Sequence, residues 1–301
     1  MKITPDPYAS QVTKPENSKT SEPTGEKEKT AKPTHHSANV SPVRRKILSW
    51  FSRVGISPSM STLDPKREKQ ALERRKQILE IQKAANLQAV LNIALNVAIT
   101  ESQSDSLDPD WFFAFSSMAE EIYSQPMQEL WGRIFALEVS KPGSFSLRSL
   151  QLLKSLTHRD AQIFSKAVSM AFRRQHDNVP RILVGYHKRR GVLSFLGPSA
   201  PQQINLAKMG LSYPDLLALQ DMKLLYASEI ESGEYEQGQQ IFWRCGNESF
   251  TLEANRSGVA LVYYKFTAVG SELAKLVSRK ENSAYLPALK ERLSNVFIVT
   301  E

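Results

Sequence analysis

The amino-acid sequence predicts a mainly α-helical fold that is followed by a smaller C-terminal α+β domain. Three observations lead to this expectation. Apolar residues recur at helical spacing through residues 64–175, and short β-rich stretches separated by Gly and Asn follow Phe172. The first 42 residues contain almost no large apolar side chain. In chain order, we expect a disordered tail at 1–42, a basic amphipathic segment with a linker at 43–62, a helical domain at 63–175 and the α+β domain at 176–301.

The N-terminal quarter carries the whole positive excess of the chain. The 301 residues include 39 Lys and Arg against 31 Asp and Glu, which gives a formal charge of +8. Residues 1–76 hold 16 of these cations against 8 acids, so the remainder is neutral. The tail at 1–42 is rich in Ser, Thr, Pro, Lys and Glu and cannot bury enough apolar surface to offset chain entropy, so we expect it to be disordered. A basic N-terminus beside a neutral folded part favours an anionic partner.

Residues 43–54 have the pattern of a basic amphipathic helix. Their apolar side chains fall on one helical face, whereas Arg44, Arg45 and Arg53 fall mostly off that face. Such a segment is typical of a helix that docks on a membrane surface or on a partner. The alternative is that it packs on the protein's own core. The apolar face consists of Val43, Ile47, Trp50, Phe51 and Val54, and the candidate docking residues are Arg44, Arg45, Trp50 and Phe51.

Two Asp-Pro pairs, at 64–65 and 108–109, mark the starts of helices, because Asp caps the first turn and Pro suits the first helical position. The first helix should extend to about Thr100. Its first half is charged and its second half is apolar almost all round, so the polar half should project into solvent while the other half is buried. Pro126 lies just inside the start of a further helix.

The stretch from Met127 to Phe164, MQELWGRIFALEVSKPGSFSLRSLQLLKSLTHRDAQIF, predicts three consecutive helices with two sharply defined joints. Gly132 in mid-helix costs about 1 kcal/mol relative to Ala, which indicates that another helix packs closely there. Ser146 is a good N-cap, with Phe145 and Leu150 placed as a hydrophobic staple across it. PGSFS has one glycine and lacks the Lys and the strand-to-helix setting of a P-loop, so we do not interpret it as a phosphate loop.

Glu138 falls near the apolar face of its helix, where a carboxylate needs a partner. Arg148 is the expected partner. A catalytic carboxylate is the alternative, but no second acid or His stands at a spacing that would serve it. The structural motif of this region consists of Trp131, Gly132, Glu138, Pro142, Gly143, Phe145 and Arg148.

This block, LWGRIFALE followed by PGSFSLRSLQLLKSLT and DA, resembles the core of a family of uncharacterised bacterial proteins that is grouped as a domain of unknown function. The resemblance covers about residues 105–295. It implies a helical block followed by an α+β region, and it implies no activity. The tail and the amphipathic segment then look like additions to the family core.

A second resemblance concerns LSYPDLLALQDMKLLYAS and YYKFTAVGSELAKLV, which are similar to the end of a winged-helix module. This implies that the C-terminal α+β domain is winged-helix-like. A wing that reads DNA should offer Lys and Arg to phosphates. Here the helix and the presumed wing are acidic, which favours a structural or protein-binding winged fold over a DNA reader. The acids are Asp215, Asp221, Glu229, Glu231, Glu234 and Glu236.

A local cluster of cations lies at the join between the helical and the mixed regions, with Tyr186 among them. Arginines beside an aromatic ring suit single-stranded nucleic acid. The alternative is a solvated loop and helix C-terminus, where cations favour the helix dipole. The candidate nucleic-acid or anion patch consists of Arg173, Arg174, Lys188, Arg189 and Arg190.

The sequence contains no pattern of a known enzyme. Cys245 is the single cysteine, which excludes an internal disulfide and a cysteine-cluster metal site. None of the five His has metal-ligand spacing, and no GxSxG or Cys/His pair occurs, so we expect no catalytic residue, no metal and no cofactor. The longest apolar run, 87–99, is shorter than the ~20 residues of a membrane span, and the N-terminus lacks a secretory h-region, so we expect a cytoplasmic protein.

We therefore predict a non-enzymatic scaffold or regulatory module that engages a protein partner through its basic N-terminus. The first alternative is a nucleic-acid-binding protein, with a role in phage defence, because some abortive-infection proteins share a similar helical block. An enzyme with an unrecognised site is the third functional hypothesis. For the amphipathic segment alone, contact with a membrane surface is a further alternative.

Overall fold

The computed structural model describes residues 41–59, 63–97, 106–175, 177–188, 202–245, 248–278 and 282–301. The expected disordered tail at 1–42 lies outside the described residues except for its last two. Residues 41–51 and the chain from Ser52 onward belong to separate compact units.

Helix α1, Pro42–Arg53, forms where the amphipathic pattern predicts a helix. None of its residues is buried. Its polar face carries Arg44, Arg45, Lys46 and Arg53, and the helix contains no Asp or Glu.

The predicted helix starts are confirmed, because each depends on a local cap. The Asp64 carboxylate accepts hydrogen bonds from the backbone N–H of Lys66 and Arg67, and Asp108 caps its helix in the same way. Thr157 and Asp160 form the expected capping box. The helices are α2 (Pro65–Asn96), α3 (Pro109–Ala119), α4 (Gln125–Ser140), α5 (Leu147–Ser155) and α6 (His158–Ser169).

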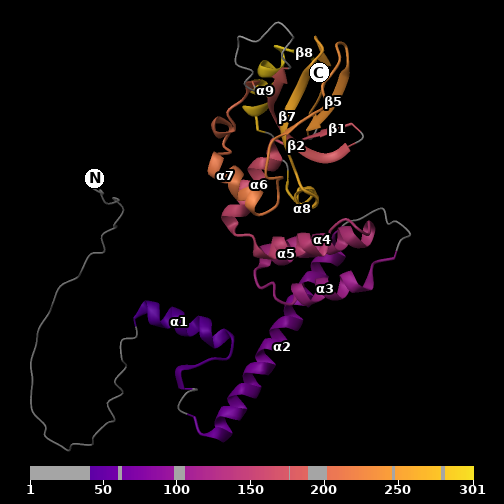
Figure 1. Ribbon diagram of the computed structural model, residues 1–301. Helices are drawn as coiled ribbons and strands as arrows, with labels where there is room; N and C mark the ends of the chain where they lie inside the picture. Colours follow the sequence, from indigo (N-terminus) through magenta and orange to yellow (C-terminus); the bar gives the residue numbers. More distant parts are fainter. Residues whose placement is uncertain are drawn as a thin grey trace, which may run out of the picture. The chain divides into compact units, whose positions relative to one another are not determined.

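Helices α2 and α4 pack closely at Gly132. A Cβ atom at this position would lie 2.5 Å from Ile93 Cγ2, so only glycine allows this approach. This confirms the expectation of close packing at Gly132. The second half of α2 is buried on one side only, however, because Leu95 is 75% exposed. Figure 1 shows the first half of α2 extending away from α3, α4 and α5.

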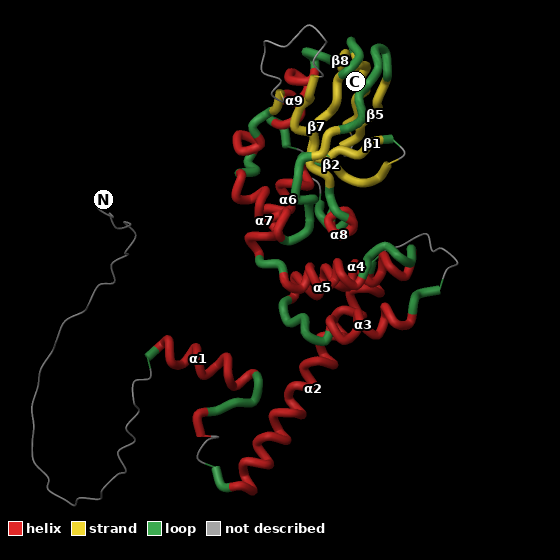
Figure 2. Tube along the Cα trace, viewed as in Figure 1, coloured by secondary structure: helices red, strands yellow, loops and turns green. Residues whose placement is uncertain are grey.

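The C-terminal region is built on an eight-stranded antiparallel sheet with the order β4-β7-β2-β1-β5-β6-β8, and β3 pairs with β2. Figure 2 shows the strands gathered in one body with helices beside it. The strands are β1 (Phe172–Arg174), β2 (Asp177–Lys188), β3 (Gln202–Gln203), β4 (Ile230–Glu231), β5 (Gln240–Cys245), β6 (Glu248–Ala254), β7 (Val259–Lys265) and β8 (Phe297–Thr300).

The expected fold class, mainly α with a smaller winged-helix-like α+β domain, is therefore wrong. The described chain combines nine α-helices with a substantial sheet, and β1 already begins at Phe172. The reason is visible in β2, whose residues 180–186 are all buried. A strand that is buried on both faces does not show the alternation that identifies a half-buried strand. Its partner β7 is distant in the sequence, and its partners β1 and β3 are short.

Four further helical segments complete the fold: η2 (Leu206–Met209), α7 (Tyr213–Asp221), α8 (Ala268–Leu273) and α9 (Tyr285–Leu293). Helix α9 packs on β2 and β8, and the Tyr285 hydroxyl donates a hydrogen bond to the Leu183 carbonyl at 2.6 Å. Helix α8 contacts both β2 and α5, so it joins the sheet to the helical block.

Candidate functional site

The joint between α4 and α5, residues 141–146, is held in shape by Glu138. One carboxylate oxygen accepts a hydrogen bond from the Gly143 N–H at 2.6 Å, and the other accepts one from the Phe145 N–H at 2.8 Å. Glu138 is 3% exposed. The expected ion pair with Arg148 is not formed among the described residues, where backbone amides satisfy the carboxylate instead. Gly143 adopts φ +79°, a left-handed conformation that suits glycine at this turn.

The N-terminus of α5 is occupied by a carboxylate from α8. One oxygen of Glu272 accepts hydrogen bonds from the Ser146 N–H at 2.7 Å, the Ser146 hydroxyl at 2.9 Å and the Ser149 hydroxyl at 2.6 Å. A helix N-terminus favours negative charge, because its first N–H groups and the helix dipole point at the ligand. The protein's own carboxylate therefore fills the place that an anion would take in PGSFS.

Lys275 adds a second connection between α8 and the joint. Its Nζ donates a hydrogen bond to the Ser144 carbonyl at 2.9 Å and lies 5.4 Å from the centroid of the Phe145 ring. The joint is thus tied to α8 through Glu272 and to the segment after α8 through Lys275. This explains why the most recognisable sequence block of the chain is structural.

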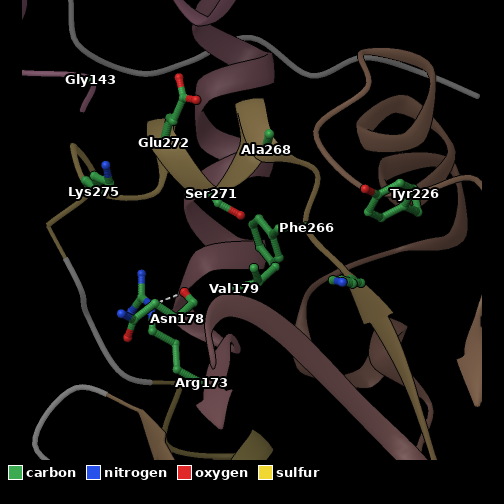
Figure 3. A pocket seen from close by; sticks show the side chains of 11 residues that line it. Gly143, Arg173, Asn178, Val179, Tyr226, Phe266, Ala268, Ser271, Glu272 and Lys275 are labelled. Carbon is green, nitrogen blue, oxygen red and sulfur yellow. Dashed lines mark hydrogen bonds between the residues drawn. The ribbon is translucent and has the colours of Figure 1, made fainter. Parts of the chain in front are cut away.

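A cavity of about 610 Å³ opens beside this joint, and we call it the junction pocket. Its lining comes from the α4–α5 joint, from β1, β2 and the end of β7, from α8 and Lys275 beyond it, and from Tyr226 after α7 (Figure 3). The Arg173 Nε donates a hydrogen bond to the Asn178 carbonyl at 3.0 Å. The charged residues that line the junction pocket are Arg173, Lys265, Glu272 and Lys275.

An ion pair between the buried Arg181 and the partly exposed Asp177 lies beside the junction pocket. The Arg181 guanidinium contacts the Asp177 carboxylate and lies 5.4 Å from the centroid of the Tyr263 ring. Burial raises the pKa of Asp177, but hydrogen bonds from the Arg181 side chain and the Val179 N–H, with the charge of Lys265, outweigh it and lower that pKa below its ordinary value. Asp177 is therefore neutralised by Arg181, and the pocket lining retains three cations against Glu272.

A smaller cavity of about 260 Å³ contains Glu229 and Tyr264. The Tyr264 hydroxyl donates a hydrogen bond to Glu229 at 2.7 Å, and the Gln203 amide donates to the same carboxylate at 2.7 Å. Burial, followed by the bond to Glu229, raises the pKa of Tyr264. Glu229 is thus part of a hydrogen-bonded cluster and not of an acidic wing.

The residues of the predicted basic patch do not lie together in the structure. Arg173 lines the junction pocket, and its neighbour Arg174 is exposed. Lys188 lies at the opposite end of β2, seven residues beyond Arg181, which is roughly 23 Å along a strand. Arg189 and Arg190 lie outside the described residues.

Sequence reasoning missed Lys265 and Lys275 as neighbours of Arg173. In the strand register, Lys265 of β7 lies opposite Arg181 of β2, and Phe172 of β1 also lies opposite Arg181. The three positions converge only through this long-range pairing, so no spacing in the sequence marks them.

An antiparallel sheet joined to a helical block defines the class of the protein, which is α+β. In the residues that the structure describes, no group of three or more His, Cys, Asp or Glu is arranged to hold a metal ion, and no helix has the length and apolar character of a membrane span.

The chain belongs to the family described as "Protein of unknown function (DUF2806)", whose model matches residues 70–290. This agrees with the resemblance to an uncharacterised family. Helix α1 precedes the matched region. No curated protein and no solved structure matches the chain.

Proposed function

We propose that the protein is a non-enzymatic scaffold or regulatory module that docks on a protein partner through α1. The observation that carries this proposal is the exposure of the apolar face of α1. Val43 is 68% exposed, Ile47 51%, Trp50 57% and Phe51 53%. A short helix with this many large exposed apolar side chains is unusual for a surface that only faces water.

The spacing on α1 suits a groove. Val43, Ile47 and Trp50 stand at i, i+4 and i+7, which is the anchor pattern of an amphipathic helix that lies in an apolar groove of a partner. Phe51 widens the same face. Twelve residues bury too little apolar area for firm anchoring in a bilayer, which favours a protein groove over a membrane.

The positive charge of α1 and the start of α2 favours a partner whose groove is bordered by acidic residues. Residues 43–76 hold ten Lys and Arg against three Asp and Glu, whereas residues 1–42 hold six against five. The positive excess thus belongs to α1 and the start of α2, and hardly to the tail. Nucleic acid is the second candidate partner, because the same cations attract a polyanion.

Trp50 offers a direct test. Of the four Trp residues it is the exposed one, since Trp111, Trp131 and Trp243 are at most 7% exposed. The full chain is immobilised to capture proteins from a lysate of the source organism, and the purified captured protein is then titrated against the free chain. We expect a blue shift of Trp50 fluorescence and loss of capture in the variant Trp50→Ala/Phe51→Ala.

Phe113→Ala is the matched control, because Phe113 is a 70% exposed aromatic residue outside α1. It should leave capture unchanged. Arg44→Glu/Arg45→Glu should weaken capture most at low salt, because charges on a rim act over the Debye length. Equal capture by all variants would refute docking through α1. Salt-sensitive binding to a single-stranded oligonucleotide, or binding to phosphatidylglycerol vesicles without any captured protein, would replace the protein partner by nucleic acid or by a membrane.

A further inference from the structure

We infer that the junction pocket binds a phosphate-bearing small molecule of nucleotide size. This site is separate from α1 and does not depend on the proposed docking function. Three cations line the pocket from different parts of the fold, namely Arg173 from β1, Lys265 from the end of β7 and Lys275 from the segment after α8. Cations that converge on one cavity form the usual receptor for phosphate groups.

These cations are not neutralised within the described chain. None of the three forms an ion pair with a described carboxylate, and two of them donate to neutral carbonyls: Arg173 to Asn178 and Lys275 to Ser144. Asp177, which precedes the lining residue Asn178, is paired with Arg181. The pocket therefore has positive charge to spare for a ligand.

Glu272 is the one carboxylate in the pocket lining, and it is already engaged. One of its oxygens accepts three hydrogen bonds at the N-terminus of α5, from Ser146 and Ser149. These bonds hold its carboxylate at the N-terminus of α5. The negative charge of Glu272 would repel a phosphate group. We therefore expect the phosphate to bind beside Arg173 and Lys265.

The rest of the lining suits the organic part of such a ligand. The Tyr226 side chain is 48% exposed and borders the pocket together with Val179 and Phe266 (Figure 3). A planar base can stack on an exposed tyrosine ring, at a typical gain of ~1–3 kcal/mol. The volume of about 610 Å³ lies within the range of small-molecule sites and exceeds what inorganic phosphate would fill.

The experiment is calorimetric titration of the full chain with AMP, ATP and inorganic phosphate. Arg173 lines the junction pocket and its neighbour Arg174 does not, so Arg173→Ala and Arg174→Ala are a matched pair on β1. We expect AMP and ATP to bind, Arg173→Ala and Lys265→Gln each to weaken binding by tenfold or more, and Arg174→Ala to leave it unchanged. Tyr226→Ala should weaken the nucleotides and not phosphate.

Several results would overturn the inference: no binding of either nucleotide at millimolar concentration, equal loss in Arg173→Ala and Arg174→Ala, or phosphate binding as tightly as AMP. The melting temperature of each variant without ligand shows that it is folded. If Arg173→Ala is unstable, Lys265→Gln still removes a charge from the pocket while it keeps most of the side chain. The variant Trp50→Ala/Phe51→Ala should bind nucleotide normally, so failure of the docking function and failure of this site give different results.

Discussion

The α4–α5 joint and helix α1 show opposite ways of using polar and apolar groups. In the joint, Glu138 and Glu272 accept five hydrogen bonds from neighbouring backbone and serine groups, and Phe145 is buried. In α1, no residue is buried and four large apolar side chains are more than half exposed.

This difference separates recognisable sequence from candidate function. The joint is the most distinctive stretch of the chain, yet its residues Ser144 and Ser146, like Glu138 that supports it, are explained by contacts within the fold. Helix α1 precedes the region that matches the family, and four of its large apolar side chains are more than half exposed. Both binding proposals therefore rest on exposed apolar area and on cations without a carboxylate partner, and not on the most distinctive sequence motif.

Of the three comparisons, the largest loss of folding stability should come from removing the Glu138 carboxylate, which shapes the α4–α5 joint. Glu138→Ala leaves the N–H groups of Gly143 and Phe145 without an acceptor, and each buried unsatisfied group costs about 1–3 kcal/mol. We expect a loss of about 3 kcal/mol in the free energy of unfolding, measured by urea denaturation. Glu129→Ala, an exposed position in the same helix, is the control. A loss below about 0.5 kcal/mol for Glu138→Ala would show that the joint does not depend on internal hydrogen bonds.

An intermediate loss of folding stability is expected when the ion pair between Asp177 and Arg181 is broken. The folded-state pKa of Asp177 is lowered, so its contribution is present above the unfolded value of about 3.9 and is lost as the pH falls through the folded pKa. Asp177→Asn should destabilise the protein at pH 7 by about 2 kcal/mol, because it leaves the nearly buried Arg181 charge without its partner.

The same variant should lose less further stability than the wild type between about pH 4 and pH 2. Thermal unfolding at several pH values measures both effects, with Asp221→Asn at the exposed end of α7 as the control. Parallel pH profiles for wild type and Asp177→Asn would mean that the pair does not stabilise the folded state.

The smallest effect should come from α1. Trp50→Ala/Phe51→Ala should change the free energy of unfolding by less than about 0.5 kcal/mol, because exposed side chains contribute little to stability. Trp131→Ala, at a fully buried position, should cost about 3–5 kcal/mol. A large loss in the α1 variant would show that this helix packs on the protein's own core, the alternative that the sequence left open.

The sequence predicted the features that depend on neighbours in the chain. The caps at Asp64, Asp108 and Thr157 are local, and the close contact at Gly132 follows from the cost of glycine in a helix. The partner of Glu138 was missed, because backbone amides carry no mark in the sequence and Arg148 was the visible cation.

The sheet and the junction pocket could not be predicted for a different reason. Arg173 pairs with Arg244, and Arg181 pairs with Lys265, so the partners are separated by 71 and 84 residues. Many strand registers are compatible with such distant segments, and only the three-dimensional packing selects one of them. The convergence of Arg173, Lys265 and Lys275 is a product of that selection.

The carboxylate at the N-terminus of α5 also has a consequence for biosynthesis. Ser146 and Glu272 are separated by 126 residues. A ribosome adds about 5–20 residues per second, so α5 is made roughly 6–25 s before the residue that caps it. During this interval the first turn of α5 keeps its unfilled N–H and hydroxyl donors in contact with water. The hydrogen bonds from Ser146 and Ser149 to Glu272 can therefore form only after residue 272 has been synthesised.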